Sequence, residues 1–147
     1  LSQLVNLRIQ LLNEAAENKE IKLKNSIKEG TFVFADTDMV DIVIRNLISN
    51  AIKFCNAGDR ITIWSTTGAE RVTVCVEDTG KGMTSDVLQK LFGTQITSTP
   101  GTKNEKGTGL GLILCKEFVQ LNGGVIWAES QHDKGSKFFF TLPKACV

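Results

Sequence analysis

Apolar side chains recur every three or four residues in three stretches of the chain, and this spacing predicts three helices. The first covers residues 1–18, and its expected apolar face consists of Leu4, Leu7, Leu11 and Ala15. The second follows Asp36, a residue type that favours helix N-caps, and its expected core face consists of Val40, Val43, Leu47, Ala51 and Phe54. The third runs from near Gly109 to Leu121, where Asn122-Gly123-Gly124 ends it. A shorter helix is expected over residues 85–92.

Alternation of apolar and polar positions predicts strands between these helices, over residues 21–27, 31–35, 60–66, 71–77, 125–129 and 137–142. The turn at Glu29-Gly30 predicts that the first two of them form a hairpin. Because helices and strands occur in mixed order, we expect an α+β protein with a mixed sheet and helices on one face.

Composition and charge narrow the range of possible functions. The chain has 147 residues, with 41% hydrophobic and 22% charged residues, which suits a single globular domain. A net charge of +1 argues against binding to nucleic acid or directly to a membrane surface, and the apolar runs are too short for a transmembrane helix. The four cysteines form no C-x-x-C pair, and His132 has no cysteine at metal-ligand spacing, so we expect reduced cysteines in an intracellular protein. Because the chain starts at Leu1, we expect a fragment of a longer protein.

Three motifs suggest chemistry. Asn46, Asn50 and Lys53 are spaced i, i+4, i+7 and so share one face of the second helix, where amide oxygens could bind a hard cation and lysine a phosphate. A solvated polar face is the alternative. The sequence Asp78-Thr79-Gly80-Lys81-Gly82-Met83 follows a strand, so its carboxylate could accept a hydrogen bond from an exocyclic amine while its glycines allow close backbone approach. The alternative is an ordinary turn.

The third motif is the run from Gly107 to Leu112, which opens a helix and could present backbone N–H groups to an anion. It has neither the preceding strand of a Rossmann fingerprint nor the lysine of a Walker A loop. The preceding residues, 93–108, show no period, and a long irregular segment of this kind often forms a lid or binding loop.

In this order, the motifs resemble those of the ATP-binding catalytic domain of two-component sensor histidine kinases, a branch of the GHKL superfamily. Residues 46–54 are similar to the N box, 78–83 to the G1 box, 91–92 to the start of the F box and 107–112 to the G2 box. The resemblance covers nearly the whole chain and implies the Bergerat fold. This fold is a two-layer α/β sandwich with a mixed, mostly antiparallel sheet and about three helices on one face. It implies one domain over residues 1–147, with an ATP lid at 93–108.

The resemblance also implies residue roles in binding Mg-ATP. Asn50 is the expected Mg²⁺ ligand, with Asn46 beside it and Lys53 reaching the phosphates, and these three are the candidate catalytic residues. Asp78 would receive the adenine amine near Ser136, and Phe54 would pack on the adenine or else belong to the core. The other nucleotide-binding candidates are Gly80, Gly82, Met83, Lys106, Gly107, Thr108, Gly109, Leu110 and Gly111. Lys103 and Lys106 are candidate phosphate contacts or solvated loop charges.

Two positions depart from the family pattern. Gln95 stands near the place of the second F-box phenylalanine, which puts lid docking in doubt. Asn46 occupies the position at which hydrolysing ATPases of the gyrase type carry a glutamate that activates water. Because an asparagine is no general base at neutral pH, the resemblance favours holding ATP for transfer rather than hydrolysing it.

The implied reaction is γ-phosphoryl transfer to a histidine on an upstream dimerisation and histidine-phosphotransfer domain that is absent here, followed by transfer to the receiver domain of a response regulator. His132 lies in a turn and is not expected to be that acceptor. The resemblance implies a homodimeric parent and a cytoplasmic catalytic domain. The alternatives are a GHKL-type ATPase, a nucleotide-insensitive docking module and a serine-directed kinase of the anti-sigma type.

Overall fold

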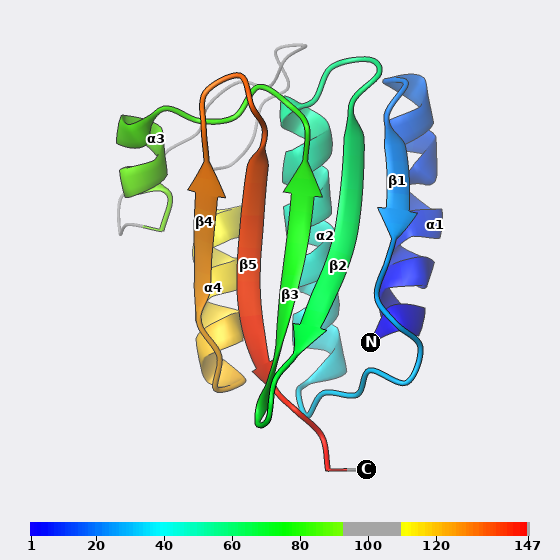
Figure 1. Cartoon of the computed structure of the whole chain (residues 1–147), viewed down its shortest axis with the longest axis vertical. Helices are drawn as coiled ribbons and strands as arrows, with labels where there is room; N and C mark the ends of the chain where they lie inside the picture. Colours follow the sequence, from blue (N-terminus) through cyan, green and yellow to red (C-terminus); the bar gives the residue numbers. More distant parts are fainter. Residues whose placement is uncertain (93–109, 147) are drawn as a thin grey trace.

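The structure is a computed structural model that describes residues 1–92 and 110–146. Figure 1 shows a sheet with helices behind it. In chain order the elements are α1 (Ser2–Asn18), β1 (Lys22–Asn25), α2 (Thr37–Phe54), β2 (Arg60–Thr67), β3 (Arg71–Asp78), α3 (Ser85–Lys90), α4 (Gly111–Leu121), β4 (Ile126–Ser130) and β5 (Ser136–Pro143). The α+β class predicted from the mixed order of elements is confirmed.

The described strands form one sheet in the order β1-β2-β3-β5-β4. β1 pairs in parallel with β2, whereas the β2–β3, β3–β5 and β4–β5 pairs are antiparallel. The sheet is therefore mixed and mostly antiparallel, as the resemblance implied. Helices α1, α2 and α4 cover one face of it (Figure 1).

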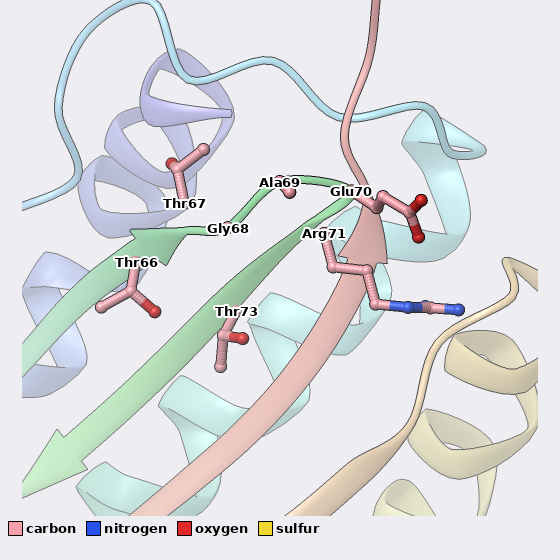
Figure 2. A pocket seen from close by; sticks show the side chains of 7 residues that line it. All are labelled: Thr66, Thr67, Gly68, Ala69, Glu70, Arg71 and Thr73. Atoms are coloured by element: carbon pink, nitrogen blue, oxygen red, sulfur yellow. The ribbon is translucent and has the colours of Figure 1, made fainter.

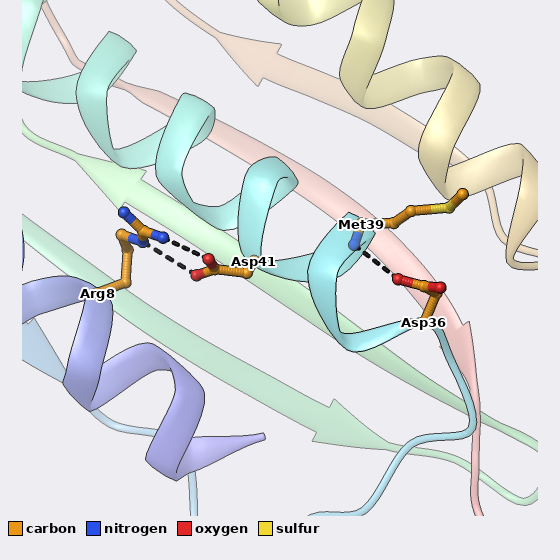
Figure 3. A network of polar contacts seen from close by, with 4 residues as sticks. All are labelled: Arg8, Asp36, Met39 and Asp41. Carbon is orange, nitrogen blue, oxygen red and sulfur yellow. Dashed lines mark hydrogen bonds and ion pairs between the residues drawn. The ribbon is translucent and has the colours of Figure 1, made fainter.

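The core lies between this sheet and α2, the central helix of the layer (Figure 1). α2 begins where the Asp36 side chain accepts a hydrogen bond from the Met39 N–H at 3.0 Å (Figure 3), so the predicted N-cap is confirmed. Its predicted face, apart from the half-buried Phe54, is buried against the inner face of the sheet. That face consists of alternate residues of the strands, among them Ile61, Ile63, Val72, Val74, Val76, Phe138, Phe140 and Leu142.

The predicted apolar face of the first helix is wrong at Leu7, Leu11 and Ala15, whereas Leu4 is partly buried against the core. Leu7 and Leu11 are 53% and 62% exposed, while Val5 and Ala16 are buried. The two stripes have the same helical spacing and lie about 100° apart around the axis, so periodicity alone does not choose between them. Tertiary contacts determine which stripe is buried. Arg8 forms an ion pair with Asp41 of α2, so the side of α1 that carries Arg8 faces α2 (Figure 3).

The predicted hairpin of residues 21–27 with 31–35 is also wrong. Residues 31–35 form no strand and contribute a single bridge, Val33 with Lys144. The Phe34 N–H donates to the carbonyl of Pro143, and the Ala145 N–H donates to that of Phe32. The segment therefore lies along the chain that leaves β5, while β1 pairs with β2 instead.

Candidate nucleotide-binding site

Asp78 is the last residue of β3 and is only 6% exposed. Its Oδ1 accepts a hydrogen bond from the Gly80 N–H at 2.9 Å, and the Ser136 N–H also bonds to the carboxylate. Burial raises the pKa of Asp78 to about 6, aided by the nearby Asp59 and Glu77, while the two backbone N–H groups act in the opposite direction. At neutral pH the carboxylate is therefore mostly ionised and can accept a further hydrogen bond.

The loop after Asp78 passes so close to two other backbone segments that side chains are excluded. A Cβ on Gly80 would lie 2.5 Å from the carbonyl oxygen of Phe54 at the end of α2. Gly82 has a φ of +67°, and a Cβ there would overlap the carbonyl of Gln131 in the turn between β4 and β5. The two glycines hence let the loop lie between α2 and that turn, beside Asp78.

A cluster of two hydroxyls ties this loop to the sheet: Ser136, which the resemblance to the family indicated, and Ser130, which the sequence did not single out. The Met83 N–H donates to Ser130 Oγ at 2.8 Å, and Ser130 Oγ lies 2.9 Å from both the Gly135 carbonyl and Ser136 Oγ. Because the Ser130 proton goes to the Gly135 carbonyl, the Ser136 hydroxyl must donate to Ser130. Ser136 thus reaches Asp78 through its backbone N–H, while its hydroxyl bonds to Ser130. An isolated serine in a strand carries no sequence signal for this role.

The last turn of α2 brings positive charge to an aromatic ring beside the loop. Phe54 is half-buried, and the Lys53 and Lys81 Nζ atoms lie 5.1 and 4.9 Å from its ring centroid. Both distances are within the range of a cation–π contact. Lys81 received no role from the sequence beyond its place in the loop. Asn50 lies one turn before Phe54, on the side of α2 that also carries Asn46.

Asn46 lies where α4 begins. A Cβ on Gly111 would be 3.7 Å from the Asn46 side chain. Burial raises the pKa of the Cys115 thiol to about 12, and a hydrogen bond with the Asn46 side chain partly opposes that shift. Gly111 of the predicted G2 box therefore lies against Asn46 of the predicted N box. The half-exposed Leu110 comes directly before Gly111 in the chain.

Some predicted residues lie outside the described residues: the lid at 93–108, with Gln95, Lys103, Lys106, Gly107 and Thr108, and also Gly109. The contacts above bring together six of the remaining candidates: Phe54, Asp78, Gly80, Gly82, Met83 and Ser136. Asn46 contacts Gly111 separately. In the part of the chain that the structure describes, no contact of the Asn50 side chain brings it into either group.

Within residues 1–92 and 110–146, no group of three or more His, Cys, Asp or Glu side chains could hold a metal ion. His132 is exposed in the turn between β4 and β5, 3.1 Å from the carboxylate of Asp133. Cys55, Cys75 and Cys115 are free and buried, whereas Cys146 is free and exposed.

A pocket of about 470 Å³ lies at the other end of β3 (Figure 2). It is lined by Thr66, Thr67, Gly68, Ala69, Glu70, Arg71 and Thr73 around the β2–β3 hairpin. None of the predicted site residues lines it, so it is separate from the Asp78 site.

Among the helices of the described part of the chain, none combines the length and apolarity needed to cross a membrane.

Comparison with known proteins gives a consistent result. The family described as histidine kinase-, DNA gyrase B- and HSP90-like ATPases matches residues 35–145. The chain is 40% identical over 113 residues to the adaptive-response sensory kinase SasA of Prochlorococcus marinus, covering 76% of this chain and 29% of SasA. The chain covers between 19% and 37% of the length of SasA and similar curated relatives.

Solved structures share the whole fold. The nucleotide-free catalytic domain of histidine kinase ThkA is 29% identical with a TM-score of 0.84, covering 98% of this chain and 92% of that one. ThkA in complex with the response regulator protein TrrA is 26% identical with a TM-score of 0.78, covering 99% of this chain and 40% of that one. With the family match spanning both α2 and the Asp78 loop, the chain belongs to the family of histidine kinase-, DNA gyrase B- and HSP90-like ATPases.

Proposed function

We propose that this domain binds Mg-ATP between the end of α2 and the Asp78 loop and supplies the γ-phosphate to a histidine on another domain of its parent protein. The observation that carries the proposal is the buried Asp78 carboxylate. It lies beside glycines that leave no room for side chains, and one of these, Gly80, packs against the backbone of Phe54, whose ring is contacted by two lysines.

The adenine would bind at the Asp78 end of the site. An ionised carboxylate accepts hydrogen bonds and donates none, so it suits the exocyclic amine of adenine. The hydrogen bonds from Gly80 and Ser136 hold Asp78 in place. The half-buried Phe54 ring offers an apolar surface for a flat base.

The triphosphate would extend along α2 towards α4. Lys53 and Lys81 lie near its start, and α4, which begins at Gly111, adds first-turn backbone N–H groups that have no partner within the helix. The described residues offer no carboxylate cage for a metal, which suits Mg²⁺, an ion that protein sites often hold through phosphates and water with few side chains. Asn50 is our candidate for the side-chain ligand. When bound, the ion would neutralise charge on the phosphates.

In the proposed transfer, an imidazole nitrogen of the acceptor histidine forms a bond to the γ-phosphorus while the bond to the bridging oxygen breaks, releasing ADP and, from the imidazole, a proton. The side chains of this domain would position the phosphates and stabilise their charge. Asn46 bonds to Cys115 and has no basic group, which supports transfer over activation of water.

We further propose that the parent carries a dimerisation domain with the acceptor histidine, that it forms a homodimer, and that the phosphate passes to a receiver domain. The ThkA complex with a response regulator supports that partner class. We place the domain in the cytoplasm, where ATP is available.

Titration calorimetry with ATP, with and without Mg²⁺, tests the proposal on the wild type and on Asn50→Ala. We expect Mg²⁺ to strengthen binding to the wild type, and Asn50→Ala to lose that enhancement with little change in melting temperature. Asn18→Ala, at an exposed position at the end of α1, is the control and should bind like the wild type. No binding of millimolar ATP to the wild type would contradict the proposal and favour a docking module.

The rate of phosphate release distinguishes a histidine kinase domain from a GHKL-type ATPase. Sustained release of phosphate from ATP by this domain alone, at the turnover of a true ATPase, would favour the hydrolytic reading. We expect release near background because Asn46 stands where hydrolysing ATPases of the gyrase type carry a glutamate, and an asparagine is no general base at neutral pH.

A further inference from the structure

Lys19 is a charged residue at a buried position. It caps the end of α1 and is only 6% exposed. Its Nζ donates hydrogen bonds to the carbonyls of Ile52 and Lys53, each at 2.9 Å. Burying an ammonium is costly unless hydrogen bonds compensate, so a buried lysine with these partners requires an explanation.

The two carbonyls belong to the last turn of α2, which ends at Phe54. The last four carbonyls of a helix have no partner within it, and this end of the helix carries partial negative charge. Besides the Cys55 N–H, which donates to the Ile52 carbonyl at 3.4 Å, Lys19 supplies from α1 donors and positive charge that stabilise the end of α2.

The next carbonyl along is held from the opposite side. The Lys81 N–H, in the loop after Asp78, donates to the Phe54 carbonyl at 3.2 Å. Three successive carbonyls at the end of α2 are thus bound by Lys19 on one side and by the nucleotide loop on the other. Their orientation determines where the Lys53 and Phe54 side chains point.

We propose that Lys19 is a positioning residue for nucleotide binding: by holding the last turn of α2 it aims Lys53 and Phe54 at the ligand and makes ATP affinity depend on the placement of α1. This inference rests on the proposed function. Lys19 does not itself touch the nucleotide and acts through Lys53 and Phe54.

A second polar contact between the same helices provides a matched control. Arg8, in the first half of α1, bonds to Asp41 through its Nε at 3.0 Å and through a second nitrogen (Figure 3). Asp41 lies in the first half of α2, three turns before Lys53. Replacing Arg8 removes a contact between α1 and the first half of α2 and keeps the Lys19 hydrogen bonds that hold the last turn.

The test is titration calorimetry with Mg-ATP on the whole chain, at a temperature where each variant is folded. Lys19→Met keeps the length of the side chain and removes the charge and the donors, and we expect affinity to fall about tenfold, a change typical of losing a charged hydrogen bond. Lys19→Arg keeps charge and donors, and should retain affinity within about threefold of the wild type. Arg8→Met should lower the melting temperature and leave affinity unchanged.

A double-mutant cycle tests whether the effect runs through Lys53. In a Lys53→Ala background, Lys19→Met should weaken ATP binding less than about twofold. A full tenfold loss in that background would mean that Lys19 does not act through Lys53, and would overturn the positioning role as proposed.

The outcomes separate the two proposals. If the wild type does not bind ATP, the proposed function fails. If it binds and Lys19→Met binds equally well, only the positioning role fails. Should Lys19→Met not fold, nuclear magnetic resonance of the buried Lys19 ammonium replaces it. We expect its signal to move on ATP addition in the wild type and to move far less in Lys53→Ala, and equal movement in both would overturn the inference.

Discussion

The carboxylate of Asp78 and the backbone N–H of Gly80, two residues further along, form a 2.9 Å hydrogen bond that closes a tight turn at the buried end of β3. The bond favours the ionised carboxylate, whereas burial disfavours it. Burial is the larger effect and raises the pKa of Asp78 to about 6. A group that must be ionised to receive an amine therefore titrates only just below neutral pH.

ATP affinity should consequently fall in mild acid. Binding requires ionised Asp78, so below pH 6 the dissociation constant should rise about tenfold for each pH unit. Asp78→Asn should bind ATP more weakly than the wild type at pH 7.5. As the pH falls, its affinity should decrease only by the amount that protonation of ATP itself causes. The measurement is calorimetry from pH 7.5 to 5 on both proteins, taking the ratio of their dissociation constants to cancel the titration of ATP. A constant ratio would contradict the assignment of Asp78.

The same raised pKa affects stability with the opposite sign. Because the folded state holds its Asp78 proton up to about pH 6 and the unfolded chain only up to 3.8, folding takes up a proton between these values, and the free energy of unfolding falls as pH rises through them. From pH 7 to pH 4, the wild type should gain about 2 kcal/mol over Asp78→Asn. Urea denaturation of both proteins at the two pH values checks this. A wild type that loses stability relative to the variant in acid would show that the pKa is lowered.

The close approach of the loop to the β4–β5 turn should make Gly82 irreplaceable. Gly82 and Gly30 both have positive φ, at +67° and +81°, but a Cβ on Gly30 meets nothing within 4 Å. Gly30→Ala should cost about 1 kcal/mol, the penalty of the left-handed conformation alone. Gly82→Ala must also move the Gln131 carbonyl, which adds about 1–3 kcal/mol. Equal losses of unfolding free energy in the two variants would mean that the turn between β4 and β5 can move away from residue 82 at no measurable cost.

The elements that sequence predicted well are those with local signals. The N-cap at Asp36 and the core face of α2 each follow from residue types at short spacing, and the structure has both of them. The predicted face of α1 was wrong because two stripes share one period, and the hairpin was wrong because residues 31–35 bond to the chain beyond β5.

The supporting residues were missed for a related reason. Lys19 is 33 residues from Ile52, and Ser130 is 47 residues from Met83. A lysine after a helix and a serine in a strand are ordinary in sequence. Only the fold brings each of them to the backbone it holds, so no local pattern could have identified them.

Ser130 offers a direct test of how the Asp78 loop is held. Ser130→Ala removes the acceptor of the Met83 N–H, the donor to the Gly135 carbonyl and the partner of the Ser136 hydroxyl, and should lower the free energy of unfolding by about 2–3 kcal/mol. Ser136→Ala loses the one hydroxyl bond that the structure gives it and should cost about 1 kcal/mol, since its backbone N–H still bonds to Asp78. Because the two hydroxyls share that bond, the double variant should lose less than the sum of the single variants, by about 0.5–1 kcal/mol. Urea denaturation of the four proteins measures this coupling, and strict additivity would mean that the two serines hold their segments independently.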